Sequence, residues 1–287
     1  MTVLDGKSAS EKLLQSIKQE VDEARKEGQR VPHLGIILVG NNPASKTYVE
    51  NKCRVARSVG FEVSQVALPN EVTEEELLKK IDAFNRDDKV DGYIVQLPLP
   101  NHINEQQVIS RIDPRKDVDG FHPMNIGRLV QGLEAFVSAT PMGILNLLET
   151  YDVPIKGKRC VVLGLDNIVG RPLANVLSSP AMGCTVTFLH GLVEDVKEYT
   201  LRADVIITAL DKPHFLKADM VKEGVTIVDV GMTRQTADNE KGYQVVGDVD
   251  FEQVAPKCAY ISPVPGGVGP MTIISLLQNT MKAYGKR

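Results

Sequence analysis

The first 120 residues of the chain alternate between compact apolar runs and segments with apolar residues at helical spacing. Apolar runs predict strands at 33–40, 62–68 and 91–100, and helical spacing predicts helices at 8–28, 44–59 and 73–84. Thr73, followed three residues later by Glu76, is typical of a capping box and indicates where the third helix begins. Apolar strands separated by helices form parallel sheets covered on both faces. This part of the chain therefore predicts an α/β domain.

A second series of the same kind starts after an apolar helix at 140–151. Strands are predicted at 159–163, 184–189, 204–209 and 225–230, with helices between them at 169–178, 194–200 and 217–222. This order is typical of a doubly wound, Rossmann-like dinucleotide-binding domain. The amphipathic segment 268–285 predicts a last helix that returns to the first domain. We therefore expect two α/β domains, each with a parallel sheet and flanking helices: 1–139 completed by 270–287, and 140–269.

Composition and charge narrow the classes of function. The chain has 287 residues and a net charge of −4, so no basic surface favours nucleic acid or an anionic membrane. No apolar run is long enough to span a bilayer, and the first residues lack the apolar core of a signal peptide, which indicates a cytoplasmic protein. The four cysteines form no CxxC pair and the five histidines have no ligand-like spacing. We therefore expect reduced thiols and no metal site.

The segment GLDNIVG at 164–170 joins a predicted strand to a predicted helix. Backbone N–H groups at the start of such a helix can hold a phosphate group. The segment is not GxGxxG, however, and a tight turn explains Gly164 and Gly170 without any ligand. The acid that normally binds ribose is also missing, because the next strand ends in His190 and Gly191. The local pattern alone leaves both interpretations open.

Further stretches resemble the bifunctional methylenetetrahydrofolate dehydrogenase/cyclohydrolase family. They are ASKTYVENK at 44–52, VQLPLP at 95–100, KDVDGFHPMNIGRL at 116–129 and SPVPGGVGPMT at 262–272. Each is long, and they occur in the order found in the family. The resemblance implies two α/β domains with a cleft between them, a tetrahydrofolate site on the first, a dinucleotide site on the second, and a homodimer.

The residues of the implied folate site agree with this chemistry. Tyr48 and Lys52 are four residues apart on one helix and share a face, and a desolvated lysine holds its proton less tightly. Gln96 interrupts an apolar strand at the end that faces a ligand crevice, and the carboxylate of Asp119 can accept paired hydrogen bonds from a pterin edge. These four are the expected catalytic and substrate-binding residues. The resemblance adds further substrate-binding residues, namely Leu97, Pro265, Gly266 and Gly267.

Each of these residues also has a purely structural interpretation. Tyr48 and Lys52 can be a half-buried tyrosine beside an exposed lysine, and Gln96 can cap the loop that follows it. The glycines and prolines of 263–272 can form a turn before the last helix. We expect Asp117 to organise its own turn and not to bind the pterin.

The implied dinucleotide site departs from the family. Its expected residues are Gly164, Leu165, Asp166, Ile168, Val169, Gly170, His190, Gly191 and Met232. The family usually has arginine and serine at Leu165 and Asp166, a second serine at Gly191, and glycine at Asp211. The groups that hold the 2′-phosphate of NADP are therefore missing. If Asp166 faces the ribose, it repels that phosphate and can accept from a free 2′-hydroxyl, so NAD becomes a candidate cofactor beside NADP.

The resemblance implies two consecutive reactions. The methylene bridge of 5,10-methylene-tetrahydrofolate loses hydride to the nicotinamide, and water then opens the methenyl product to 10-formyl-tetrahydrofolate. Lys52 is expected to transfer the proton in the second step, with Gln96 tuning it and Tyr48 orienting it. Two alternatives remain at this point: a cyclohydrolase with an impaired dehydrogenase half, and a non-catalytic folate-binding protein.

Overall fold

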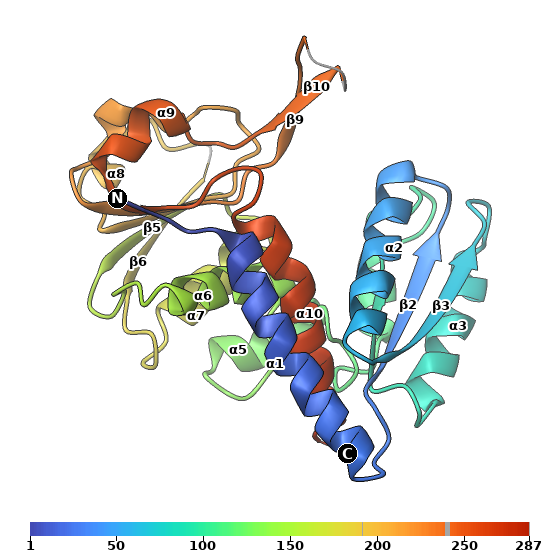
Figure 1. Ribbon diagram of the computed structural model, residues 1–287. Coiled ribbons are helices and arrows are strands. Elements are labelled where there is room, and N and C mark those ends of the chain that lie inside the picture. Colours follow the sequence, from blue (N-terminus) through green and yellow to red (C-terminus); the bar gives the residue numbers. More distant parts are fainter. Residues whose placement is uncertain (191, 239–241, 287) are drawn as a thin grey trace. The chain divides into compact units, whose positions relative to one another are not determined.

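The computed structural model describes residues 1–190, 192–238 and 242–286. The chain divides into two compact units. Unit 1 consists of Met1–Glu11 and Thr140–Thr272, and unit 2 consists of Lys12–Ala139 and Ile273–Arg287. Figure 1 shows helices packed beside the strands of each unit. The predicted α/β class is confirmed.

Unit 2 is built on a parallel sheet with the strand order β3-β2-β4. Its strands are β2 (His33–Val39), β3 (Glu62–Leu68) and β4 (Gly92–Val95). Its helices are α2 (Pro43–Ser58), α3 (Glu74–Arg86), α4 (Glu105–Arg111) and α5 (Pro123–Val130), together with most of α1 (Gly6–Lys26) and α10 (Val268–Tyr284). The capping box predicted at Thr73 and Glu76 is present at the start of α3.

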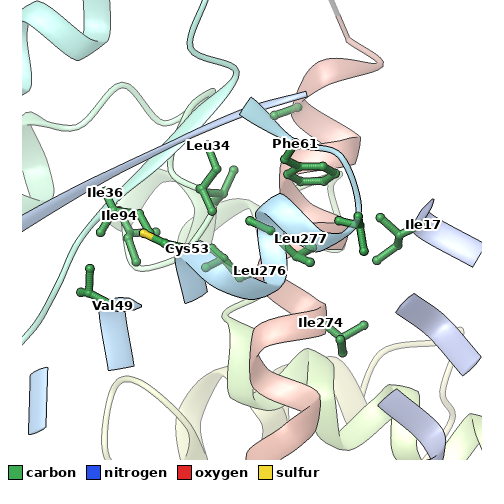
Figure 2. Packing of buried hydrophobic residues seen from close by; sticks show 14 of the residues in the cluster. Ile17, Leu34, Ile36, Val49, Cys53, Phe61, Ile94, Ile274, Leu276 and Leu277 are labelled. Atoms are coloured by element: carbon green, nitrogen blue, oxygen red, sulfur yellow. The ribbon is translucent and has the colours of Figure 1, made fainter. Parts of the chain in front are cut away.

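Alternation along β2 divides the core of unit 2 into two layers. Leu34, Ile36 and Leu38 pack with apolar residues of α1, α2 and α10, and Figure 2 shows this cluster. Ile37 and Val39 pack with residues of α3 and α4. Because successive side chains of a strand point to opposite faces, the sheet has helices on both sides, and α2 and α3 lie on opposite sides of it in Figure 1.

Unit 1 contains a larger parallel sheet with the order β1-β11-β8-β7-β5-β6. Its strands are β1 (Thr2–Val3), β5 (Arg159–Leu163), β6 (Thr185–Leu189), β7 (Val205–Thr208), β8 (Val225–Asp229) and β11 (Cys258–Ile261). Its helices are α6 (Ala139–Thr150), α7 (Gly170–Leu177), α8 (Val196–Thr200) and α9 (Phe251–Val254). Unit 1 also contains two 3-10 turns, η1 (Ala218–Met220) and η2 (Ala255–Lys257). An antiparallel hairpin is formed by β9 (Thr233–Thr236) and β10 (Tyr243–Val246). The chain leaves β5 toward β6 on one side and later returns to β7 on the other. In sheets of this type ligands bind at the carboxyl ends of the strands where the order reverses, here β5 and β7.

Two predicted elements need correction. The predicted helix at 217–222 is only the 3-10 turn η1, because Val221 is extended and buried and Gly224 has a positive φ of 74°. The strand predicted at 91–100 ends at Val95, although the N–H of Gln96 still donates to the carbonyl of Ile37 at 2.9 Å. The prolines that follow cannot extend the ladder, since they have no N–H group.

Several short elements were not predicted from the sequence: β1, β11, the β9–β10 hairpin, α4, α5 and α9. Most are shorter than two helical turns or five strand residues, too short for a periodic pattern. Among the described residues, no helix combines the length and apolar character needed to cross a membrane.

Candidate functional site

Helix α2 positions Tyr48 and Lys52. The side chain of Asn42 accepts from the N–H groups of the first turn, so the helix begins directly after β2. Val49 and Cys53 are buried against the sheet, as Figure 2 shows. Tyr48 and Lys52 each precede one of these residues, so they lie about 100° around the helix, at the border of the buried face. Tyr48 is 45% exposed and Lys52 is half-buried.

Lys52 meets Gln96 from an element 44 residues away. Its Nζ donates to Oε1 of Gln96 at 3.0 Å. Nε2 of Gln96 donates to the carbonyl of Leu97 at 2.6 Å. The second bond fixes which end of the amide faces the lysine. Gln96 therefore both caps its own loop and holds the ammonium group.

The loop after β4 is organised by Asp117, as predicted. Its buried carboxylate accepts from the N–H groups of Phe121 at 3.2 Å and His122 at 2.8 Å, and from Nδ2 of Asn125 at 2.8 Å. Gly120 has a positive φ of 74°, and a Cβ there would lie 2.7 Å from the N atom of Ser138. These contacts define the backbone on both sides of Asp119.

Asp119 is the unsatisfied acid of this loop. It is half-buried, and no group in the described part of the chain donates a hydrogen bond to its carboxylate. Burial raises the pKa of Asp119 from 3.8 to about 6, the Asp117 charge adds to the rise, and the Lys52 charge opposes it. The Asp119 oxygens are not among the fully buried atoms that lack a partner, so water or a ligand can reach them. Asp119 is therefore placed to accept hydrogen bonds from a bound molecule.

This arrangement predicts that Asp119→Asn stabilises the protein at alkaline pH. The pKa of Asp119 is higher in the folded protein than in the unfolded chain. The contribution of Asp119 to the free energy of unfolding is therefore fully present when the pH is below the unfolded-state pKa, and it is lost as the pH rises through about 6. The asparagine variant cannot ionise, so its free energy of unfolding should exceed that of the unaltered protein by about 1–3 kcal/mol at pH 8. The difference should shrink as the pH falls to 5. Denaturant titrations at both pH values measure it.

Asp113→Asn is the matched control for this prediction. The ion pair with Arg115 lowers the pKa of Asp113, so its ionised form favours folding and its substitution should destabilise the protein at pH 8. Equal stability of the Asp119→Asn variant and the unaltered protein at pH 8 would contradict the pKa assigned to Asp119.

The position of Tyr48 is less constrained. Its hydroxyl has no hydrogen-bond partner among the residues that the structure describes. Tyr48 therefore does not orient Lys52 through a direct hydrogen bond in this structure. Leu97 follows Gln96 directly and is also half-buried.

The loop that contains Pro265, Gly266 and Gly267 belongs to unit 1. The N–H of Gly6 donates to the carbonyl of Gly266 at 2.9 Å. Gly266 has a positive φ of 108°, and a Cβ on Gly267 would lie 2.7 Å from the carbonyl oxygen of Pro263. The backbone geometry of unit 1 therefore accounts for both glycines. The predicted contact of these residues with folate stays a prediction.

Close backbone contacts define the turn after β5 in unit 1. Gly164 has a positive φ of 111°, and a Cβ there would lie 2.1 Å from the carbonyl oxygen of Ala209, which follows β7. A Cβ on Gly170 would lie 2.0 Å from the carbonyl oxygen of Gly164. Gly164 therefore allows the loops after β5 and β7 to touch where the strand order reverses, and Gly170 allows the turn after β5 to close on itself.

Asp166 is turned toward its own backbone in the structure. Its carboxylate accepts from the N–H groups of Ile168 at 2.8 Å, Val169 at 2.6 Å and Gly170 at 3.3 Å. In this conformation the Asp166 carboxylate therefore faces its own backbone and not a ribose site. Arg171 is a cation beside this turn, and its Nε donates to the carbonyl of Leu165 at 3.1 Å.

Loops at the carboxyl ends of the strands of unit 1 carry exposed apolar side chains. Ile168 is 42% exposed after β5, Leu192 is 86% exposed after β6, and Met232 is 51% exposed after β8. Such side chains suit the flat rings of a dinucleotide. His190 is exposed at the end of β6. Its neighbour Gly191 lies outside the described residues.

Asp229 and Asp248 are buried acids at this edge that sequence reasoning missed. Asp229 accepts from the hydroxyl of Thr208 and from three backbone N–H groups of the loops after β8 and β10. Asp248 accepts from the N–H groups of Leu210 and Lys212 at 2.7 Å each. The sequence did contain a signal for Asp229. A polar residue there interrupts an otherwise apolar predicted strand near its carboxyl end, and Gln96 was singled out for the same reason.

Asp248 holds the loop that contains Asp211. Asp211 has a positive φ of 53°, a conformation that favours glycine and that aspartate tolerates better than most residues. This explains in physical terms why a family that usually has glycine there accepts an aspartate in this chain. Among the described residues, no cluster of three or more His, Cys, Asp or Glu side chains could hold a metal ion.

The fold and these residues define a class of protein. One unit has a dinucleotide-type sheet with a strand reversal, and in the other Lys52 of α2 donates to Gln96 after β4 while Asp119 has no donor among the described residues. Two-domain α/β enzymes that use a nicotinamide dinucleotide combine these features.

Comparison with known proteins identifies the family. Residues 4–119 match the family profile "Tetrahydrofolate dehydrogenase/cyclohydrolase, catalytic domain", and residues 138–287 match "Tetrahydrofolate dehydrogenase/cyclohydrolase, NAD(P)-binding domain". The chain belongs to this family.

Relatives and solved structures agree over the whole chain. The bifunctional protein FolD of Flavobacterium johnsoniae is 54% identical, with 100% of this chain and 98% of the relative covered. The crystal structure of a bifunctional FolD methylenetetrahydrofolate dehydrogenase/cyclohydrolase from Campylobacter jejuni has a TM-score of 0.95 at 46% identity, covering 100% of this chain and 99% of that one. A Trypanosoma brucei FolD complexed with NADP cofactor and inhibitor has a TM-score of 0.93 at 34% identity, covering 100% and 98%.

Proposed function

We propose that this protein oxidises 5,10-methylene-tetrahydrofolate to 5,10-methenyl-tetrahydrofolate with a nicotinamide dinucleotide and hydrolyses the product to 10-formyl-tetrahydrofolate. Membership of the tetrahydrofolate dehydrogenase/cyclohydrolase family supports both steps. The single observation that carries the proposal is the 3.0 Å hydrogen bond between Lys52 and Gln96, on elements far apart in sequence.

In this proposal unit 2 binds the folate and unit 1 binds the dinucleotide. Asp119 accepts from the aminopyrimidine edge of the pterin through charge-assisted hydrogen bonds. Those bonds compensate the burial that raises its pKa. Leu97 and Tyr48 are the neighbouring residues proposed to contact the folate. The homodimer implied by the resemblance also stays a proposal, which sedimentation equilibrium can measure.

Lys52 is the proposed proton carrier in the hydration step. Water adds to the cationic methenyl carbon and loses one proton, which gives a neutral hydroxyl adduct. The ring nitrogen then accepts a proton as its bond to that carbon breaks, and the hydroxyl proton leaves as the formyl C=O forms, so that one proton is released overall. Gln96 accepts from Lys52, so it fixes the ammonium group while leaving donors free for the substrate. Tyr48, one helical turn before Lys52, is proposed to position the folate beside it.

The dinucleotide supplies a nicotinamide ring that receives the hydride when it is bound. The loops after β5, β6 and β8 fit such a cofactor, since they expose Ile168, Leu192 and Met232 at the sheet edge. They fit a 2′-phosphate poorly. Leu165 offers no donor, and Arg171 donates to the loop itself.

We therefore expect NAD to be used at least as well as NADP, or neither to be used efficiently. Loss of each charge-assisted hydrogen bond to a phosphate costs on the order of 1.5–3 kcal/mol, or roughly ten- to a hundredfold in affinity. Dehydrogenase kcat/KM with each cofactor measures the preference. The double substitution Leu165→Arg, Asp166→Ser should shift it toward NADP. A clear NADP preference in the unaltered protein, unimproved by this double substitution, would contradict the expectation.

A second candidate function is a cyclohydrolase with an impaired dehydrogenase half. The observation that favours it is the self-bonded turn at 164–170, because the Asp166 carboxylate already occupies N–H groups that a phosphate would use. Separate assays of methylene oxidation and methenyl hydrolysis distinguish the proposals. Both activities support the bifunctional enzyme, hydrolysis alone supports the second candidate, and the absence of both leaves only folate binding.

A further inference from the structure

Asp229, at the end of β8, is a buried acid that none of the proposed steps uses. It is 3% exposed. Its Oδ1 accepts from the hydroxyl of Thr208 at 2.9 Å and from the N–H groups of Gly231 at 3.0 Å and Asp248 at 3.1 Å. Its Oδ2 accepts from the N–H of Val249 at 2.9 Å. Burial raises the pKa of Asp229 to about 6, so the carboxylate is ionised at neutral pH and both oxygens can accept.

A second buried acid, Asp248, extends this network to the loop after β7. Its carboxylate accepts from the N–H groups of Leu210 and Lys212 at 2.7 Å each. A Cβ on Gly231 would collide with the Asp248 carboxylate, so the loop after β8 packs directly against the loop after β10. Through Asp229 and Asp248, the loops after β7, β8 and β10 are therefore fixed to one another.

The network holds the loop after β7 in an unusual conformation. Asp211 and His214 have positive φ angles of 53° and 54°, which residues other than glycine rarely adopt. Asp211 lies between the two residues whose N–H groups donate to Asp248, and the N–H of His214 donates to the carbonyl of Gly247 at 3.1 Å. Such conformations persist where surrounding contacts impose them, and they cluster at ligand-binding sites.

The strand order indicates which part of a dinucleotide this edge of the sheet would meet. In a doubly wound sheet each half binds one mononucleotide, and the two halves meet where the order reverses. Strands β5 and β6 form one half, and β7 and β8 begin the other. The half that contains the glycine turn and the strand after it takes the adenosine part. The loops after β7 and β8, with the exposed side chain of Met232, therefore face the nicotinamide part.

We propose that Asp229 is a positioning residue for the nicotinamide half of the dinucleotide. The inference rests on the dinucleotide use proposed above. The Asp229 carboxylate fixes the loops after β7, β8 and β10 before a cofactor binds, so that these loops meet the nicotinamide ring in one arrangement. Hydride transfer depends steeply on the placement of the reacting atoms, and a misplacement of about 1 Å can cost about 100-fold in rate. A change at Asp229 should therefore affect the oxidation step, and not adenosine binding or the hydration step in unit 2.

NADH and ADP-ribose test this in the full-length protein, because ADP-ribose lacks the nicotinamide ring. Titration calorimetry gives the Kd of each without requiring catalysis. Asp229→Asn replaces one acceptor oxygen by an NH₂ group, which cannot accept from the N–H groups that face it. We expect its affinity for NADH to fall about tenfold and its dehydrogenase kcat to fall about 10- to 100-fold. Its affinity for ADP-ribose and its rate of methenyl hydrolysis should stay within about twofold. If the unaltered protein prefers NADP, NADPH and 2′-phospho-ADP-ribose replace this pair.

Thr208→Val is a milder variant that removes one donor to Asp229 and keeps the side-chain volume. It should show the same pattern, with a fall of about three- to tenfold in NADH affinity and kcat. Thr208→Ser keeps the hydroxyl and should restore both values. These two variants decide the question if Asp229→Asn does not fold.

Asp204→Asn is the matched control for general destabilisation of unit 1. Asp204 lies directly before β7, at the amino end of the same sheet. Its carboxylate accepts from the N–H of Arg159 at 2.9 Å and forms an ion pair with Lys222. Its substitution should lower the unfolding midpoint and leave NADH affinity and dehydrogenase kcat unchanged.

The proposal is overturned if Asp229→Asn and Thr208→Val keep the NADH affinity and kcat of the unaltered protein. It is also overturned if ADP-ribose affinity falls as far as NADH affinity, or if Asp204→Asn reproduces the loss, because destabilisation of unit 1 then explains the effect. These results are distinguishable from failure of the proposed function. An unaltered protein that binds neither the reduced dinucleotide nor its ring-free fragment loses the dehydrogenase half of that function together with this inference.

Discussion

Lys52→Met is expected to lower the rate of methenyl-tetrahydrofolate hydrolysis by about 10²- to 10⁴-fold, the range that a positioned proton carrier contributes. Methionine keeps most of the side-chain volume, so the packing of α2 beside Val49 and Cys53 should persist. It removes the ammonium group that donates to Gln96 at 3.0 Å. Folate binding should stay within about threefold, because Asp119 remains. Stopped-flow hydrolysis at neutral pH and equilibrium folate binding measure the two effects.

Lys46→Met is the matched control for this prediction. Lys46 lies on the same helix and is exposed, so its substitution removes an equal charge without reaching Gln96. Its hydrolysis rate should equal that of the unaltered protein. Hydrolysis by Lys52→Met at the unaltered rate would remove Lys52 from the mechanism, whatever its effect on binding.

Asp119→Ala should weaken folate binding by roughly ten- to a hundredfold, since it removes charge-assisted hydrogen bonds worth about 1.5–3 kcal/mol each. Both reactions should fall together at low folate concentration, because they share this contact. At saturating folate the loss should be much smaller. Fluorescence titration with a tetrahydrofolate and steady-state kinetics of both reactions distinguish this pattern from that of Lys52→Met.

Glu71→Ala tests whether the loss follows from any acid of unit 2. Glu71 is exposed, and its substitution should leave folate affinity unchanged. Unchanged folate affinity of Asp119→Ala itself would show that the raised pKa of Asp119, about 6, reflects burial alone and has no role in ligand binding.

The sequence by itself determined the α/β class and most of the regular elements. Burial sets the spacing of apolar residues in both helices and strands. Because β2 is covered on both faces, its sequence is a nearly continuous apolar run, which predicts a strand without coordinates. The same reasoning placed Tyr48 and Lys52 on one helix face and placed Gln96 at the end of a strand. Sequence reasoning could not place short elements such as α4 and β11. These are too short to show a periodic pattern of apolar residues, and contacts with neighbouring elements stabilise them.

Only the tertiary structure decided which of these residues meet and which way they face. Lys52 and Gln96 lie on α2 and after β4, and the packing of α2 on the sheet brings them to 3.0 Å. The predicted helix at 217–222 became a 3-10 turn because burial of Val221 in an extended conformation outweighed its local helical spacing. Asp166 is turned toward its own backbone because three N–H groups, those of Ile168 and Val169 before α7 and of Gly170 at its start, donate to its carboxylate. Side-chain direction depends on donors and neighbours that are distant in sequence or defined by backbone geometry, and residue order does not contain them.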